Sequence, residues 1–84
     1  MPGDLSGYRK EIDRIDDEIL RLLNERSKSV IEIGHIKKAQ DADANLHTPA
    51  REAAIIERLV GQNTGPFPSE AIRPVYREIM SASL

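Results

Sequence analysis

The fold is decided by the stretch LSGYRKEIDRIDDEILRLLNERSKSVIEIGHIKKA, residues 5–39. It contains no proline, and its early apolar residues are separated by alternating steps of three and four: Leu5, Tyr8, Ile12, Ile15, Ile19 and Leu22. This spacing is typical of an amphipathic helix whose apolar seam has a period of nearly 3.5 residues. Such a helix is about 50 Å long, whereas a compact chain of this size is about 25–30 Å across. We therefore expect a second copy of the chain to cover the seam.

Two shorter helices are expected after this one. Residues 40–47 lose the helical period and indicate a polar loop. A helix over about 49–61 follows, then a turn-rich connector at 62–68 and a helix over about 70–84. No strand pattern is present, so the sequence predicts an all-α fold. We expect one domain over residues 1–84, with two copies interlocked through their long helices in a homodimeric bundle.

Composition excludes several classes of protein. The chain has 84 residues, with 12 Lys+Arg against 14 Asp+Glu, and a net charge of −2. A nucleic-acid-binding protein would show a basic excess or a basic face. The absence of cysteine excludes disulfides and thiol catalysis and favours a cytoplasmic location. No apolar run approaches the roughly 18 residues of a membrane span.

Charged and polar residues interrupt the apolar stripes of all the expected helices. Arg26 and Lys37 occupy seam positions of the long helix, about three turns or 16 Å apart on one face. Glu52 heads the stripe of the second helix, and Ser83 closes that of the third. Arg9 lies about 100° off the Arg26 face, so it would reach a site in the partner subunit. Each residue alone has an ordinary structural explanation, as a snorkelling cation or an acid in a first turn.

Together these residues indicate a polar pocket inside the bundle. Buried or half-buried charge is costly unless it is paired. Two cations against one carboxylate leave the pocket net positive, which suits a small anion that carries carboxylates. Arginine is the residue that grips a carboxylate at two points.

Four segments carry a resemblance to a known family. They are Tyr8–Asp16 (YRKEIDRID), Leu22–Arg26 (LLNER), Ile33–Lys37 (IGHIK) and Pro49–Glu52 (PARE). Together they resemble the all-helical chorismate mutases, over nearly the whole chain from about residue 5. The resemblance implies an intertwined homodimer that converts chorismate to prephenate, in aromatic amino-acid biosynthesis, without a metal or an organic cofactor. Such modules often precede prephenate dehydratase in a bifunctional protein.

The resemblance also implies a role for each site residue. Arg9 would enter the partner's pocket and bind one substrate carboxylate, and Arg26 would bind the other. Lys37 would donate to the ether oxygen, and Glu52 would accept from the ring hydroxyl. Ser83 would assist at a carboxylate.

Two further positions belong to this pattern, and two departures from it concern the pocket. Arg51 would support the network, and position 48 would line the pocket near the hydroxyl. Position 48 is Thr, where the family often has Asp. The family also places Gln or Glu four residues after Ser83, beyond Leu84. We expect either that the chain is shortened within its third helix or that the natural chain continues, for example into a fused catalytic domain.

Three other interpretations remain open at this point. Isochorismate pyruvate lyase shares the family's fold and carboxylate clamps. A non-catalytic dimerisation or regulatory module would need the seam charges only to fix register. A calcium-binding loop has suitable oxygen spacing but lacks the glycine of its sixth position; its candidate ligands are Asp41, Asp43, Asn45 and Glu52. His35 and His47 are expected to face solvent and are assigned no role.

Overall fold

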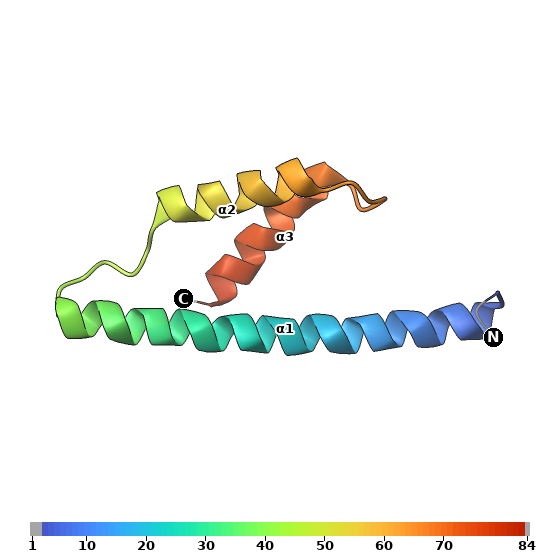
Figure 1. Cartoon of the computed structure of the whole chain (residues 1–84), viewed down its shortest axis with the longest axis horizontal. Helices are drawn as coiled ribbons and strands as arrows, with labels where there is room; N and C mark the ends of the chain where they lie inside the picture. Colours follow the sequence, from blue (N-terminus) through green and yellow to red (C-terminus); the bar gives the residue numbers. More distant parts are fainter. Residues whose placement is uncertain (1–2, 84) are drawn as a thin grey trace. The chain divides into compact units, whose positions relative to one another are not determined.

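The computed structural model is all-α, as the sequence predicts, and it describes residues 3–83 (Figure 1). Within these residues the helices are α1 (Leu5–Gln40), α2 (Pro49–Gln62) and α3 (Ser69–Ala82). The chain divides into two compact units, one ending at Ile33 and the other beginning at Gly34. The second unit therefore holds the last turns of α1 together with α2 and α3. In the part of the chain that the structure describes, no helix is both long enough and apolar enough to span a membrane.

α1 begins with a side-chain cap and carries ion pairs along its exposed surface. The Asp4 carboxylate accepts a hydrogen bond from the Gly7 backbone N–H at 2.6 Å, which satisfies a donor that a helix start leaves free. Further along, Arg14 pairs with Glu11, and Arg21 bridges Glu18 and Glu25. Such i,i+3 and i,i+4 pairs each contribute only a few tenths of a kcal/mol.

The apolar seam of α1 is uncovered in the single chain. Its first six residues have exposed fractions from 42% to 67%: Leu5, Tyr8, Ile12, Ile15, Ile19 and Leu22. No residue of α1 is fully buried. The apolar surface of α1 therefore stays exposed, because the unit that ends at Ile33 contains no other described helix that could cover it.

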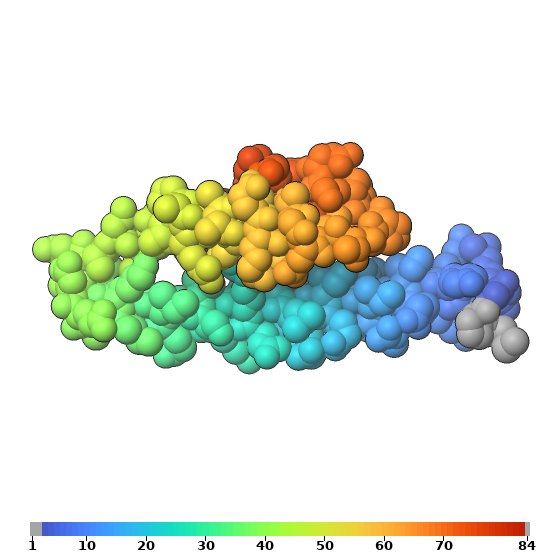
Figure 2. Space-filling model, turned by 45° about the horizontal axis from the view of Figure 1, so that its top comes forward, coloured from blue at the N-terminus to red at the C-terminus, as the bar shows by residue number. Residues whose placement is uncertain are grey.

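α2 and α3 pack side by side and supply the fully buried residues of the described chain (Figures 1 and 2). Ile56 of α2 and Met80 of α3 are each 6% exposed. The connector between the helices is held by Asn63, whose amide nitrogen donates to the Phe67 carbonyl at 2.8 Å and to the Ser69 hydroxyl at 2.9 Å. One amide thereby joins the end of α2 to the start of α3.

α3 begins within one residue of the start expected from the sequence, at about residue 70. The helix begins at Ser69 and continues through Pro74. Pro74 lies beyond the first turn, so it removes the backbone hydrogen bond that would go to the Glu70 carbonyl and places its ring against that carbonyl. At the other end α3 stops at Ala82, and Ser83 is its C-cap. Leu84, with which the expected helix ended, lies outside the described residues.

Candidate functional site

The start of α2 carries three of the site residues that the sequence predicts. Thr48 is the N-cap, and Arg51 and Glu52 lie in the first turn. The Glu52 backbone N–H donates to the Thr48 carbonyl at 3.1 Å. Among the described residues, no side-chain bond caps this helix, so the Thr48 hydroxyl is not used in capping. A carboxylate in a first helical turn is stabilised by the helix dipole.

Glu52 has a neighbour that the sequence interpretation left out. Nδ1 of His47 lies 3.7 Å from Oε2 of Glu52, with 51% of the histidine side chain and 30% of the glutamate side chain exposed. His47 is exposed, as we expected, but it lies beside the predicted catalytic carboxylate. The only sequence signal for this contact is that His47 immediately precedes the N-cap of the helix that carries Glu52.

The loop before α2 is fixed by hydrogen bonds to its backbone. Nζ of Lys38 donates to the carbonyls of Ala42 and Ala44, at 3.1 Å and 2.9 Å. Oδ1 of Asn45 accepts from the His47 backbone N–H at 3.0 Å. The loop is therefore tied to the last turn of α1 at one end and shaped by an Asx turn at the other.

The two other predicted residues of this unit lie at helix ends. Lys37 is in the last turn of α1 and is half-buried, although most of its neighbours on that helix are exposed. Ser83 follows α3, and its hydroxyl donates to the Ile79 carbonyl at 2.8 Å. That bond is local, so it ties Ser83 to its own helix and not to α2.

The two predicted arginines belong to α1 in the unit that ends at Ile33. Arg9 is exposed in the second turn of the helix. Arg26 and Lys37 both belong to α1, and an ideal helix repeats its face after about three turns, which is their separation along the sequence. Neither arginine is in the ion pairs of Arg14 and Arg21 that line the exposed surface.

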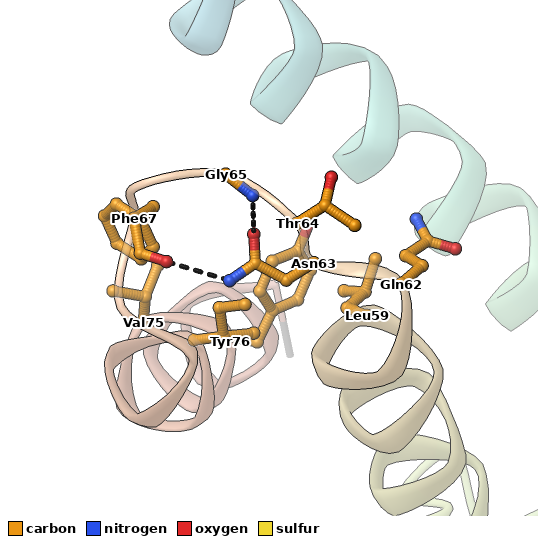
Figure 3. Close-up of a pocket in the computed structure, with 9 residues that line it drawn as sticks. Leu59, Gln62, Asn63, Thr64, Gly65, Phe67, Val75 and Tyr76 are labelled. Carbon is orange, nitrogen blue, oxygen red and sulfur yellow. Dashed lines mark hydrogen bonds between the residues drawn. The ribbon is translucent and has the colours of Figure 1, made fainter.

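A hollow lies at the far end of the α2–α3 pair, away from the start of α2. Its volume is about 410 Å³, and Figure 3 shows Leu59, Phe67, Val75 and Tyr76 around it with the connector that Asn63 holds. None of the predicted site residues lines it. Its walls are mostly apolar and carry no charged side chain, so it does not match a site for an anion with two carboxylates.

The calcium-loop interpretation finds no support in the geometry of residues 3–83. No cluster there contains three or more side chains of the metal-ligating types His, Cys, Asp and Glu. Oδ1 of Asp41 accepts a hydrogen bond from the Asp43 backbone N–H at 3.0 Å, and α2 begins at Pro49, inside the span that the calcium loop would need. The side-chain oxygens of Asp41 and Asn45 therefore accept hydrogen bonds within local turns.

Comparison with known proteins identifies the family of the chain. The profile of the family described as chorismate mutase type II matches residues 8–84. The chain belongs to this family. The resemblance drawn from the four sequence segments is therefore confirmed.

Relatives and solved structures agree with this membership. The bifunctional chorismate mutase/prephenate dehydratase of Aquifex aeolicus (strain VF5) is 51% identical over 96% of this chain and 23% of its own length. That of Neisseria gonorrhoeae is 42% identical over 92% of this chain and 20% of its own length. The chain thus spans about a quarter or less of these curated relatives. A chorismate mutase structure from Thermus thermophilus (form I) superposes with a TM-score of 0.87 at 42% identity, covering 95% of this chain and 98% of that one.

Proposed function

We propose that this chain catalyses the intramolecular Claisen rearrangement of chorismate to prephenate, as a homodimer in the cytoplasm. The observation that carries the proposal is the register of the family's residues on the helices. Arg26 and Lys37 share one face of α1, and Thr48, Arg51 and Glu52 are gathered at the start of α2. The family match runs through all these positions.

The proposed chemistry needs positioned charges and no nucleophile. A unimolecular rearrangement is accelerated by holding the substrate in its reactive conformer, which Arg26 and the partner's Arg9 would do by clamping its two carboxylates. Negative charge develops on the ether oxygen as the C–O bond breaks. Lys37 would donate to that oxygen, because a donor aimed at developing charge lowers the barrier most.

The remaining residues would bind the substrate's other polar groups. Glu52 would accept a hydrogen bond from the ring hydroxyl, with Thr48 near that hydroxyl. Arg51 would support this network, and Ser83 would assist at a substrate carboxylate. No step in this scheme uses a metal or an organic cofactor.

The dimer is part of the proposal because the site is incomplete without it. Arg9 lies off the face that Arg26 and Lys37 share, so it would complete the pocket of the other subunit. The uncovered seam of α1, with Tyr8 58% and Ile12 55% exposed, is the surface on which the two copies would meet. Contiguous apolar surface of this kind marks an interaction site. The curated relatives combine a chorismate mutase with a prephenate dehydratase, which supports a fused second enzyme in the natural protein.

The direct test follows chorismate by its ultraviolet absorbance and identifies the product. We expect prephenate, and we expect Arg26→Ala to abolish turnover while the helical circular dichroism is unchanged. Arg14→Ala is the matched control, since it removes a cation from the exposed surface of the same helix. Release of pyruvate from isochorismate, with no prephenate formed from chorismate, would assign the chain to the lyase activity instead.

A further inference from the structure

His47 stands beside the carboxylate that the proposed function needs, and the mechanism above does not use it. We propose that His47 is a positioning residue for Glu52, and that its protonated ring holds the carboxylate in place for the substrate's ring hydroxyl. This inference rests on the function proposed above, since it assigns a task to Glu52. Its physical basis is the approach of Nδ1 of His47 to Oε2 of Glu52, at 3.7 Å.

The distance identifies the kind of interaction. Nitrogen–oxygen hydrogen bonds are about 2.7–3.2 Å long, so this contact is too long to be one. It lies within the range of an ion pair, whose strength depends on the charge of the ring. Histidine is the side chain that ordinarily changes charge between about pH 5 and pH 8. The contact is therefore an ion pair when the His47 ring is protonated and a weak polar contact when the ring is neutral.

Both partners of the pair are held by the backbone around them. Asn45 fixes the His47 backbone N–H, and Lys38 fixes the loop through the carbonyls of Ala42 and Ala44. Glu52 is tied to the Thr48 carbonyl through its own backbone N–H. Because neither end depends on the ring contact for its place, the contact orients the Glu52 side chain and does not build the loop.

Charged groups of α1 and of the loop before α2 are engaged elsewhere, so Glu52 is the partner of His47. Among the described residues of α2, Glu52 is the charged residue that lies within ion-pair distance of His47. From α1, Lys38 directs its ammonium to loop carbonyls. Within the loop, Asp41 accepts from the backbone N–H of Asp43. The charge of the His47 ring is therefore felt first by Glu52.

The direction of the pH effect follows from this pairing. An ion pair with Glu52 needs a charged imidazole, so the pair exists where the ring is protonated and is lost at higher pH, where the ring is neutral. With the pair present, Oε2 is held by the ring and Oε1 is left for the substrate hydroxyl. When the pair is lost, the Glu52 side chain regains rotamer freedom, and kcat/KM falls.

The test compares pH profiles of kcat/KM between about pH 5.5 and pH 8 for the wild-type chain and three variants. For His47→Gln we expect a loss of about two- to five-fold at the acid end, the size typical of a partly exposed ion pair, and wild-type values at the basic end. For His47→Lys, which stays charged throughout, we expect the acid-end value to persist to the basic end. His35→Gln, at the chain's other histidine, should follow the wild type. A His47→Gln profile identical to the wild-type profile overturns the inference and leaves the proposed function intact.

A second measurement tests the pair without any turnover. We expect Glu52→Gln to change the pH titration of the His47 ring resonances in NMR spectra and to leave those of His35 unchanged. An unchanged His47 titration overturns the inference even if the enzyme is inactive. Absence of mutase turnover in the wild-type chain, by contrast, contradicts the proposed function itself. The two failures are therefore distinguishable.

Discussion

Arg73 of α3 bonds to Glu57 of α2, sixteen residues away in the sequence, and joins the two helices by a side-chain ion pair. The hydrogen bond from Arg73, followed by its charge, lowers the pKa of Glu57 below its ordinary value. Both side chains are exposed, at 40% for Arg73 and 61% for Glu57. The ion pair therefore contributes little to the packing of α2 against α3 and is not its main source.

The first prediction concerns acid stability. Because the pKa of Glu57 is lower in the folded chain than in the unfolded chain, the pair stabilises the fold above the ordinary glutamate pKa of about 4.3. That contribution is lost as pH falls through the folded pKa. We expect Glu57→Gln to lower the melting temperature slightly at pH 7 and not at all in strong acid, because exposed pairs contribute little. Glu78→Gln, at an exposed glutamate of α3, is the control for loss of a carboxylate; an equal effect of both changes would contradict the prediction.

The second prediction concerns the core between α2 and α3. Ile56 is 6% exposed, and truncating a buried isoleucine to alanine costs about 2–5 kcal/mol through lost transfer energy and the cavity left behind. We expect Ile56→Ala to reduce the free energy of unfolding by an amount in this range, measured by urea denaturation followed by circular dichroism. Val75→Ala, at a residue of α3 that is 43% exposed, should cost much less. Equal losses would show that Ile56 is not the centre of this packing.

Sequence patterns predict this fold well because the apolar periods of its helices are long and clear. The apolar period from Leu5 to Leu22 and the Thr48-Pro49 pair at the start of α2 are short-range sequence patterns. The helices that they predict form in the folded chain.

The candidate site was predictable only in part. Arg26, Lys37 and Glu52 are visible in the sequence because they interrupt apolar stripes. The His47–Glu52 contact depends on the path of a loop that Lys38 and Asn45 fix through backbone carbonyl and N–H groups. No periodicity encodes such a path. The Arg73–Glu57 pair was missed for a related reason, since it depends on how two helices are rotated against each other.

The third prediction concerns the proposed donor to the ether oxygen. Lys37→Met keeps the length and apolar stem of the side chain and removes its charge. We expect kcat to fall by about 10²–10³-fold, the cost of removing one donor aimed at developing charge. KM should change less, because both carboxylate clamps remain. Lys28→Met is the control on the exposed surface of α1. A Lys37→Met enzyme with wild-type kcat would remove Lys37 from the reaction.

The fourth prediction concerns the seam through which the proposed dimer forms. Ile15 is 42% exposed in the single chain, and Ile15→Lys would place a charge inside the helix–helix contact. We expect this variant to sediment as a monomer and to lose turnover, since Arg9 no longer reaches a partner's pocket. Asp17→Lys lies about 200° around the same helix and should remain dimeric and active. A monomeric Ile15→Lys chain with full turnover would mean that each pocket is complete within one subunit.

The last prediction separates the subunits that contribute to one pocket. If Arg9 acts in the partner's pocket, an Arg9→Ala chain and an Arg26→Ala chain are each inactive alone but complementary in a heterodimer. One of its two pockets combines the intact Arg9 of one subunit with the intact Arg26 of the other. Equimolar unfolding and refolding of the two variants makes half of the dimers mixed, so about one quarter of wild-type activity should return.

A matched mixture provides the control for this complementation. Arg26 and Lys37 are proposed to serve the same pocket from one subunit, so a mixture of Arg26→Ala and Lys37→Met chains contains no complete pocket in any dimer. That mixture should stay inactive under the same refolding conditions. Recovery in both mixtures would show that activity returns for a reason other than shared pockets. Recovery in neither, with mixed dimers present, would place Arg9 outside the partner's site.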